Sequence, residues 1–281
     1  MQQWFQLAGW ALKISIMIQL LAIGLGTNWR EATYLFRQPA LLLKSILARN
    51  VAVPIVAVLL IKLFTLRPAV AIALGVLALT PVPPLLPKGQ LKGGGRSEYV
   101  LGLLVSQAVL SITLVPLTIV AMNWSLGSQA HFGAGQVAKL VIQSILIPLG
   151  VGILTARFFP KLKAIAPRLL SIGSVLMIVG AVPLLLVAWK AFGALTGNGT
   201  LWAMAIFVVA ATAVGHFLGG PLEEDRTALA IAASARHPAL AIAIARDNFS
   251  DQATLVSGAI IIYLLLRTVL SLPYVRLRRA P

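Results

Sequence analysis

Three residues with chemical potential follow one another inside an apolar stretch: Arg236, His237 and Pro238. The stretch, residues 223–249, is long enough to cross a bilayer, and Ala, Ile and Leu flank the three residues on both sides. A charge at the bilayer centre costs at least about 2.5 kcal/mol, and a proline removes a helix hydrogen bond. We therefore expect these residues to stabilise or to line an internal cavity.

Each of these residues has a functional and a structural interpretation. Arg236 presents a planar fork that suits a carboxylate, so it is a counter-ion for an anionic substrate, a stand-in for a missing cation, or a structural residue bonded to freed carbonyls. His237 is a candidate proton shuttle, although a histidine beside a helix break more often caps backbone groups. Ser234, three residues before His237, is a further candidate binding residue. Pro238 is interpreted as architectural.

Closely spaced prolines interrupt a second apolar stretch, residues 69–91. Each proline removes a donor and restrains the residue before it, so this stretch cannot form one continuous helix. Two interrupted segments in corresponding places of two halves indicate a transporter's midplane binding site. Thr80 therefore joins the candidate binding residues, and the predicted crossover or hinge residues are Pro81, Pro83, Pro84 and Pro238.

A third set of polar residues lies in the stretch 98–122. Gln107 and Ser111 are spaced i, i+4 and share a helix face, so they are candidate cavity-lining residues. The alternative is an interhelical hydrogen bond worth about 1 kcal/mol. Lys13 and Gln19, in the first apolar stretch, are assigned no role.

Composition defines the class of protein. The 281 residues are 59% hydrophobic and 11% charged, with a mean hydropathy of +0.94, whereas soluble domains contain about 25% charged residues. We predict an all-α polytopic membrane protein forming a single membrane domain over residues 1–281. The nine expected spans are residues 7–26, 39–66, 69–91, 98–122, 136–157, 167–189, 201–218, 225–247 and 254–274.

These spans divide into a 4+5 inverted repeat with two broken crossover helices. Residues 1–123 form the first repeat, of four helices, and residues 135–275 form the second, of five. An inverted repeat needs an odd number of spans in each unit, so the first repeat is interpreted as a five-helix unit whose first helix is absent.

The basic residues predict an orientation. Lysine and arginine gather in cytoplasmic loops, which also explains the net charge of +16 without nucleic acid. One side of the nine-span topology receives Arg30, Arg37, Lys88, Lys92, Arg96, Arg157, Lys161, Lys163, Arg168, Arg226, Arg276, Arg278 and Arg279, and the other receives only Lys62, Arg67, Lys139, Lys190 and Arg246. We expect a multi-pass protein of the cell (inner) membrane, with the N-terminus outside and the C-terminus cytoplasmic.

Two local expectations follow from charges near the ends of spans. Lys44 and Arg49, early in the span 39–66, are expected to extend towards the membrane interface. Glu223, Glu224 and Asp225 open the span 225–247, where acids complement the helix dipole and Asp225 is a candidate N-cap. A cation-entry or gating role is the alternative for these three acids.

An enzyme is the rival class. It needs paired acids, a nucleophile with its base, or a metal cluster within the spans. The chain has no cysteine, and its three histidines are scattered along the sequence. We therefore predict no catalytic residues, no metal site, no cofactor and no nucleic-acid partner.

Three stretches resemble the bile acid:sodium symporter (BASS) superfamily. They are RQPALLLKSILARNVAVPIVAVLL, LALTPVPPLLPKGQLKGGGRSEYVLGLLVSQAVLSITLVPLTI and EDRTALAIAASARHPALAIAIA, and with the order of helices they cover most of the chain. The resemblance implies ten helices, or nine when the first is absent, in a panel domain and a core domain where two discontinuous helices cross. Members carry organic anions, often coupled to sodium.

The chain departs from that pattern at the second crossover. Sodium-coupled members have an acidic residue and a Gln-Asn pair there; aligning the pair with Arg236 and His237 places Ala232 at the acid. The chain is thus similar to a divergent, bacterial-type member without the usual sodium-site acid. We predict a secondary transporter of a small organic anion working by alternating access in the lipid bilayer. Uniport, a proton-coupled or degenerate sodium-coupled symporter, and a non-transporting sensor or channel are the alternatives; the sequence leaves the substrate and oligomeric state open.

Overall fold

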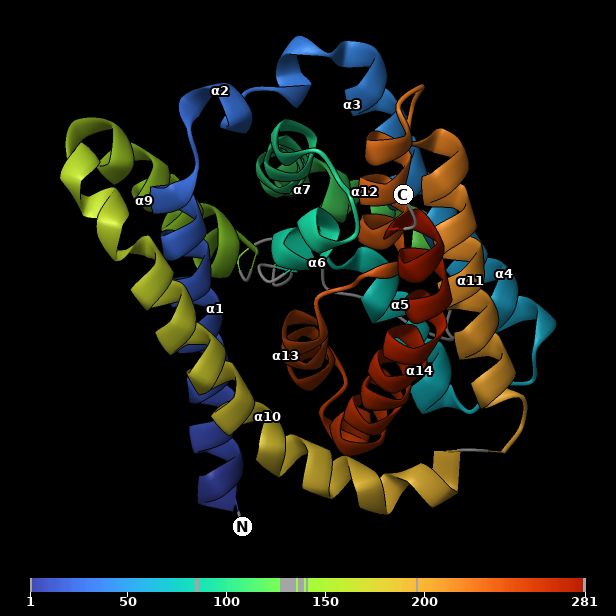
Figure 1. The fold of residues 1–281 in the computed structure, drawn as a ribbon. Coiled ribbons are helices and arrows are strands. Elements are labelled where there is room, and N and C mark those ends of the chain that lie inside the picture. Colours follow the sequence, from blue (N-terminus) through green and yellow to red (C-terminus); the bar gives the residue numbers. More distant parts are fainter. Residues whose placement is uncertain are drawn as a thin grey trace.

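The computed structural model describes residues 2–83, 86–126, 135, 139, 141–195 and 197–279, and the described chain is helical with no strand. Figure 1 shows its arrangement. The elements are α1 (Gln2–Gly26), α2 (Trp29–Ala32), α3 (Pro39–Ile46), a π-helical turn (Leu47–Ala52), α4 (Val53–Leu63), α5 (Pro68–Leu79), α6 (Leu86–Lys92), α7 (Ser97–Leu126), a second π-helical turn (Ile142–Leu146), α9 (Ile147–Phe158), α10 (Ala166–Leu195), α11 (Thr200–Leu218), α12 (Glu223–Ser234), α13 (Pro238–Asn248) and α14 (Ala253–Arg279). Short 3-10 turns, Leu35–Arg37, Pro160–Ile165 and Ser250–Gln252, complete the connections.

The described helices are those of a polytopic membrane protein. Among the described residues, six helical segments are at least 18 residues long and apolar enough to cross a bilayer, and three shorter apolar helices accompany them. Some of these segments combine successive elements, as Pro39–Leu63 and Glu223–Asn248 do. Many of their large apolar side chains are exposed, as expected for surfaces that face lipid. The predicted all-α membrane class is confirmed, whereas the count of nine spans and the inverted repeat stay predictions.

The helices pack as two groups. One group, the α1 group, consists of α1, α9 and α10, which pack mainly against one another. Gly24 and Gly152 let α1 and α9 approach closely, because a Cβ at either position would overlap backbone atoms of the other helix. The other helices form a central group around α5, α12, α13 and α14, and α10 runs beneath it to contact α14 (Figure 1). The α1 group therefore lines one side of the space between the two groups, and the central group lines the other.

The first helix break follows from its prolines. Helix α5 starts with Pro68 and ends at Leu79. A proline fits the first position of a helix because the N–H there has no acceptor within the helix. Pro81 disfavours helical backbone at the residue before it, and Thr80 accordingly adopts φ −76°, ψ 140°. Residues 80–83 are not helical, and the chain resumes as α6 at Leu86. Pro84 lies outside the described residues.

The second break is centred on Pro238. Helix α12 ends at Ser234, and residues 235–237 are extended before Pro238 opens α13. His237 adopts φ −83°, ψ 95°, as the residue before a proline must, and its side chain accepts a hydrogen bond from the Leu240 N–H. The interruptions predicted in the stretches 69–91 and 225–247 therefore agree with the observed helix ends.

Charged residues join three helices at one end of the bundle. Arg96, just before α7, bonds Asp225 of α12 at 3.0 Å, and the Asp225 side chain is only 1% exposed. Asp225 does not cap the helix, as the sequence had suggested, because α12 begins at Glu223 with Leu222 at the N-cap. Burial lowers the pKa of the Arg96 guanidinium, but Asp225 and Tyr34 raise it by a larger amount, so its pKa lies above the ordinary value. Arg278 of α14 forms an ion pair with Glu223, which lies in the same first turn of α12 as Asp225.

Candidate functional site

The two helix breaks meet inside the central group. The Thr80 hydroxyl accepts a hydrogen bond from the His237 N–H at 3.0 Å and donates to the Leu77 carbonyl at 2.8 Å. Pro81 removes the N–H that would have continued α5 at that carbonyl. The Thr80 hydroxyl therefore gives a hydrogen-bond partner to one freed backbone group on each broken segment. These two hydrogen bonds hold Thr80 beside His237.

Arg236 bonds to main-chain oxygens around this junction. Its Nη1 donates to the Ala78 carbonyl at 3.4 Å and to the Thr80 carbonyl at 3.3 Å, and its Nη2 donates to the Arg49 carbonyl at 3.2 Å. The side chain is 3% exposed. These contacts match the structural role that the sequence left open, since the guanidinium group bonds carbonyls at the end of α5. They leave its Nε without an acceptor among the described residues.

Tyr263 of α14 bridges the second break. Its hydroxyl donates to the Ser234 carbonyl and accepts from the Arg236 N–H at 3.0 Å. The Ser234 carbonyl is the one that the residue at 238 would have bonded in a continuous helix, and Pro238 cannot donate to it. The fully buried tyrosine therefore replaces the interrupted helix hydrogen bonds.

Arg49 lies in the same junction, and its predicted position at the membrane interface is wrong. Its side chain is 1% exposed, and Nη1 donates to the Ala232 carbonyl near the end of α12. The π-helical turn Leu47–Ala52 contains this residue. Nε and Nη2 of Arg49 find no acceptor in the described part of the chain. Lys44, by contrast, is exposed, as expected.

A cavity of about 350 Å³ lies where the second break faces the α1 group. The central group contributes the polar residues Arg236, His237 and Arg267, whereas Gln19 is the polar contribution of the α1 group. The remaining lining is apolar and includes Pro83, Pro238, Ala239, Leu12, Ile16, Met177, Ala181, Leu86, Ile242, Ile261 and Leu264, together with Gly89. None of the seven acidic residues, all of which the structure describes, lines this cavity.

Three of the residues that line the cavity carry hydrogen-bond donors without an acceptor in the described structure. Arg236 Nε, His237 Nε2 and Arg267 Nε are buried and have no hydrogen-bond partner among the described residues. Because His237 Nδ1 accepts from the Leu240 N–H, the neutral ring carries its proton on Nε2, which is then a donor. The N-terminus of α13 also begins at this wall and adds a positive partial charge. Buried donors normally have partners, so this set indicates a site for an anion.

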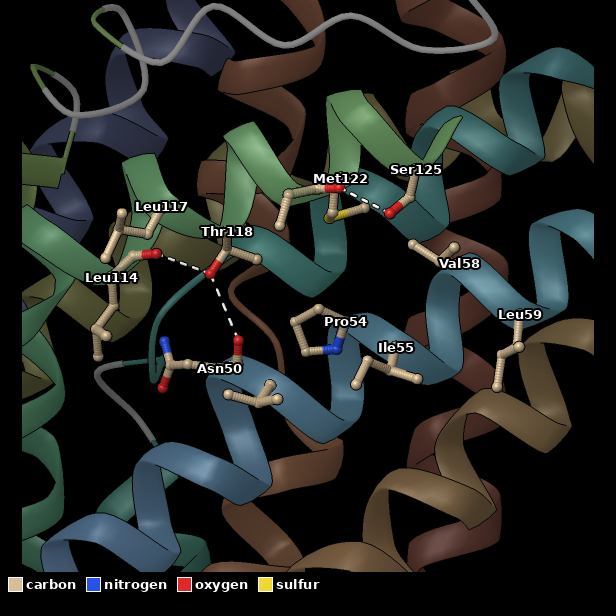
Figure 2. Close-up of a pocket in the computed structure, with 12 residues that line it drawn as sticks. Asn50, Pro54, Ile55, Val58, Leu59, Leu114, Leu117, Thr118, Met122 and Ser125 are labelled. Atoms are coloured by element: carbon tan, nitrogen blue, oxygen red, sulfur yellow. Dashed lines mark hydrogen bonds between the residues drawn. The ribbon is translucent and has the colours of Figure 1, made fainter. Parts of the chain in front are cut away.

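A second cavity, of about 510 Å³, lies between α4 and α7 (Figure 2). Its lining is mostly apolar, and Ile55, Leu59 and Leu117 on its rim are about half exposed or more. Thr118 bonds the carbonyls of Leu114 and Asn50 there, at 2.7 and 3.5 Å. Among the described residues that line this cavity none is charged, so the smaller, charged cavity is the better candidate for a polar ligand.

The other predicted binding residues lie apart from the charged cavity. The Ser234 hydroxyl bonds within its own helix, to the carbonyls of Ala230 and Ile231. Gln107 and Ser111 are buried in α7 and do not line the charged cavity; Ser111 bonds the Ala108 carbonyl at 2.5 Å. Of the predicted crossover prolines, Pro81 is buried in the first break, whereas Pro83 and Pro238 reach the cavity.

Four polar residues of the junction and cavity were not predicted as binding residues: Gln19, Arg49, Tyr263 and Arg267. Arg49 and Arg267 carried a usable signal, since an ionisable residue within a span indicates function by default. Gln19 offered a weaker one, and its amide donates to Ser15 Oγ and to the Gly173 carbonyl, both at 3.0 Å. A tyrosine such as Tyr263 in an apolar span carries only the general expectation that its hydroxyl bonds a neighbour.

A helical membrane protein with a charged cavity beside two helix breaks belongs to the class of membrane transporters. The sequence model of the sodium bile acid symporter family matches residues 13–194, more than half of the chain, and the chain belongs to this family. The predicted family is thereby confirmed, as is the prediction that the protein is a transporter of this type and not an enzyme. The match includes the first break but ends before Arg236. No curated protein matches the chain.

Proposed function

We propose that the protein is a secondary transporter of a small organic anion. The observation that carries this proposal is the set of three unpartnered donors, on Arg236, His237 and Arg267, around a cavity without an acidic residue. A carboxylate accepts several hydrogen bonds and neutralises a guanidinium group, so it fits such a lining. The volume of about 350 Å³ is at the lower end for ligand cavities, which favours a small anion.

The position of the cavity supports alternating access as the proposed mechanism. Its charged wall belongs to the central group, and the wall formed by α1 and α10 is nearly apolar. The α1 group corresponds to the panel and the central group to the core that the sequence resemblance implies. Movement of one group against the other exposes the cavity to one side of the membrane and then to the other, while Arg236 and His237 stay fixed at the breaks.

Proton coupling through His237 is disfavoured by the same geometry. Its Nδ1 accepts the hydrogen bond that caps α13, so a second proton on the ring must break this cap. We therefore propose uniport or exchange of the anion. We also propose that the protein lies in the cell membrane with its N-terminus outside and its C-terminus in the cytoplasm. The excess of lysine and arginine on one side of the nine-span topology supports that orientation.

A binding screen tests the proposed site. Acetate, pyruvate, succinate and benzoate are added to purified wild-type protein in detergent, and the unfolding temperature is recorded. We expect at least one carboxylate to raise it in a saturable way, and Arg267→Gln to weaken that effect about tenfold or more. Arg246→Gln is the matched control, because Arg246 is exposed on α13 and does not line the cavity. Equal loss in both variants, or no response to any carboxylate or other organic anion, would contradict the assignment.

A further inference from the structure

Carbonyl oxygens at the ends of broken helices attract cations. In transporters with interrupted spans, unwound carbonyls and the C-terminal ends of half-helices coordinate the coupling ion. The corresponding carbonyls here are those of Ala78 and Thr80 at the end of α5, and of Ala232 and Ser234 at the end of α12. Their partners decide whether a sodium ion can bind at the junction.

Guanidinium groups take three of these four oxygens. Arg236 bonds the carbonyls of Ala78 and Thr80, and Arg49 bonds that of Ala232. The fourth, on Ser234, is bonded by the Tyr263 hydroxyl. The two arginines are also linked to each other, because Arg236 Nη2 donates to the Arg49 carbonyl at 3.2 Å.

The side chains around the junction do not fit a sodium ion. Sodium prefers several oxygen ligands and is repelled by a neighbouring guanidinium group. Ala232 stands where sodium-coupled relatives are expected to have an acid, and the hydroxyls at the junction, on Thr80, Ser234 and Tyr263, are already bonded to backbone groups. Both arginines are nearly fully buried, so each guanidinium group lies among the carbonyls of the junction and away from solvent.

We propose that Arg236 and Arg49 are tethered cations that occupy the carbonyl sites of a coupling ion and make the transporter independent of sodium. The proposal deepens the proposed function, on which it rests for the meaning of coupling. The arginines supply the positive charge that stabilises the helix ends and the bound anion. Their covalent attachment means that no cation gradient contributes to transport.

Cation titrations without any organic anion test this proposal separately from transport. In the wild-type protein, replacing 100 mM choline chloride with sodium chloride is expected to leave the unfolding temperature unchanged within about 1 °C. Arg236→Ala frees the carbonyls of Ala78 and Thr80. In this variant sodium or millimolar guanidinium is expected to raise the temperature by about 3–5 °C over choline, as a bound cation would. Arg267→Ala, which removes a cavity charge not bonded to these carbonyls, is expected to show no such difference.

Two results would overturn the proposal. One is a marked sodium-specific stabilisation of the wild-type protein. The other is a folded Arg236→Ala variant that responds equally to sodium, guanidinium and choline, as a structural arginine without cation-site character predicts. If Arg236→Ala does not fold, Arg49→Gln serves the same purpose, because it frees the Ala232 carbonyl; the wild-type titration remains decisive in any case. Sodium independence without any response to carboxylates would instead contradict the proposed function alone.

Discussion

Tyr263→Phe is the sharpest test of how the second break is held. The substitution removes only the hydroxyl that bridges the Ser234 carbonyl and the Arg236 N–H. The ring stays in place, since its contact with Phe207, at 6.0 Å between centroids, is independent of the hydroxyl.

The magnitude follows from the two groups that lose their partner. A buried backbone group left without a hydrogen bond costs about 1–3 kcal/mol, so the loss of both contacts is expected to cost about 2–4 kcal/mol after partial relaxation. For a chain of this size that corresponds to a fall of roughly 5–15 °C in the unfolding temperature. The Arg236 side chain also becomes less well positioned, because the same hydroxyl holds its backbone.

Thermal unfolding of the purified variants in detergent measures this effect. Tyr274→Phe is the matched control on the same helix, since its hydroxyl bonds His216 at 3.0 Å in a half-buried site and its loss should cost less than about 1 kcal/mol. Equal unfolding temperatures for Tyr263→Phe, Tyr274→Phe and the wild type would refute the bridging role. Destabilisation by Tyr263→Phe with unchanged carboxylate binding would refute only the link to Arg236.

Three further predictions concern the junction, the charged end and the topology. Thr80→Val should cost about 1–3 kcal/mol of unfolding free energy, because it leaves the His237 N–H without its acceptor. Thr80→Ser keeps the hydroxyl and should be close to wild type. Equal losses of unfolding free energy for the two variants in chemical denaturation would contradict this. Arg96→Ala should destabilise the protein by about 1–3 kcal/mol, because its partner Asp225 is only 1% exposed. Arg278→Ala should cost less than about 1 kcal/mol, because its partner Glu223 is 65% exposed. A larger loss for Arg278→Ala than for Arg96→Ala would contradict this reasoning from the burial of the two carboxylates. In this cysteine-free chain, a membrane-impermeant maleimide should label Ser250→Cys in intact cells but Gln38→Cys only after lysis, and the opposite pattern would invert the proposed topology.

The helix breaks were predictable because they depend on covalent chemistry. Pro81, Pro83 and Pro238 lack an N–H and restrain the residue before them, whatever surrounds them, so the sequence indicates both interruptions. The significance of Arg236 was predictable for a similar reason, since a charge inside an apolar span needs a partner. The particular partners, carbonyls of α5 and of Arg49, depend on how distant segments pack and have no local signal.

Arg49 shows where such reasoning fails. Its distance from the start of the span 39–66 favours the membrane interface, because a long side chain ordinarily extends towards water. The structure instead places it in a π-helical turn, with its side chain at the end of α12. A π-helical turn has no dependable sequence signature, so the inward direction of Arg49 required the three-dimensional structure. Ser234 and Ser111 are equally instructive, since polar type and spacing do not distinguish a cavity wall from a hydrogen bond within a helix.

Counterflow in proteoliposomes directly tests whether the protein transports a carboxylate and whether this transport is independent of sodium. Vesicles containing the purified protein are loaded with an unlabelled carboxylate chosen by the binding screen, and uptake of the same labelled carboxylate is followed in choline buffer and in sodium buffer. We expect saturable counterflow at equal rates in both buffers, reduced by Arg267→Gln and unchanged by Arg246→Gln. Flux that rises linearly without saturation, or counterflow that appears only with sodium, would contradict it.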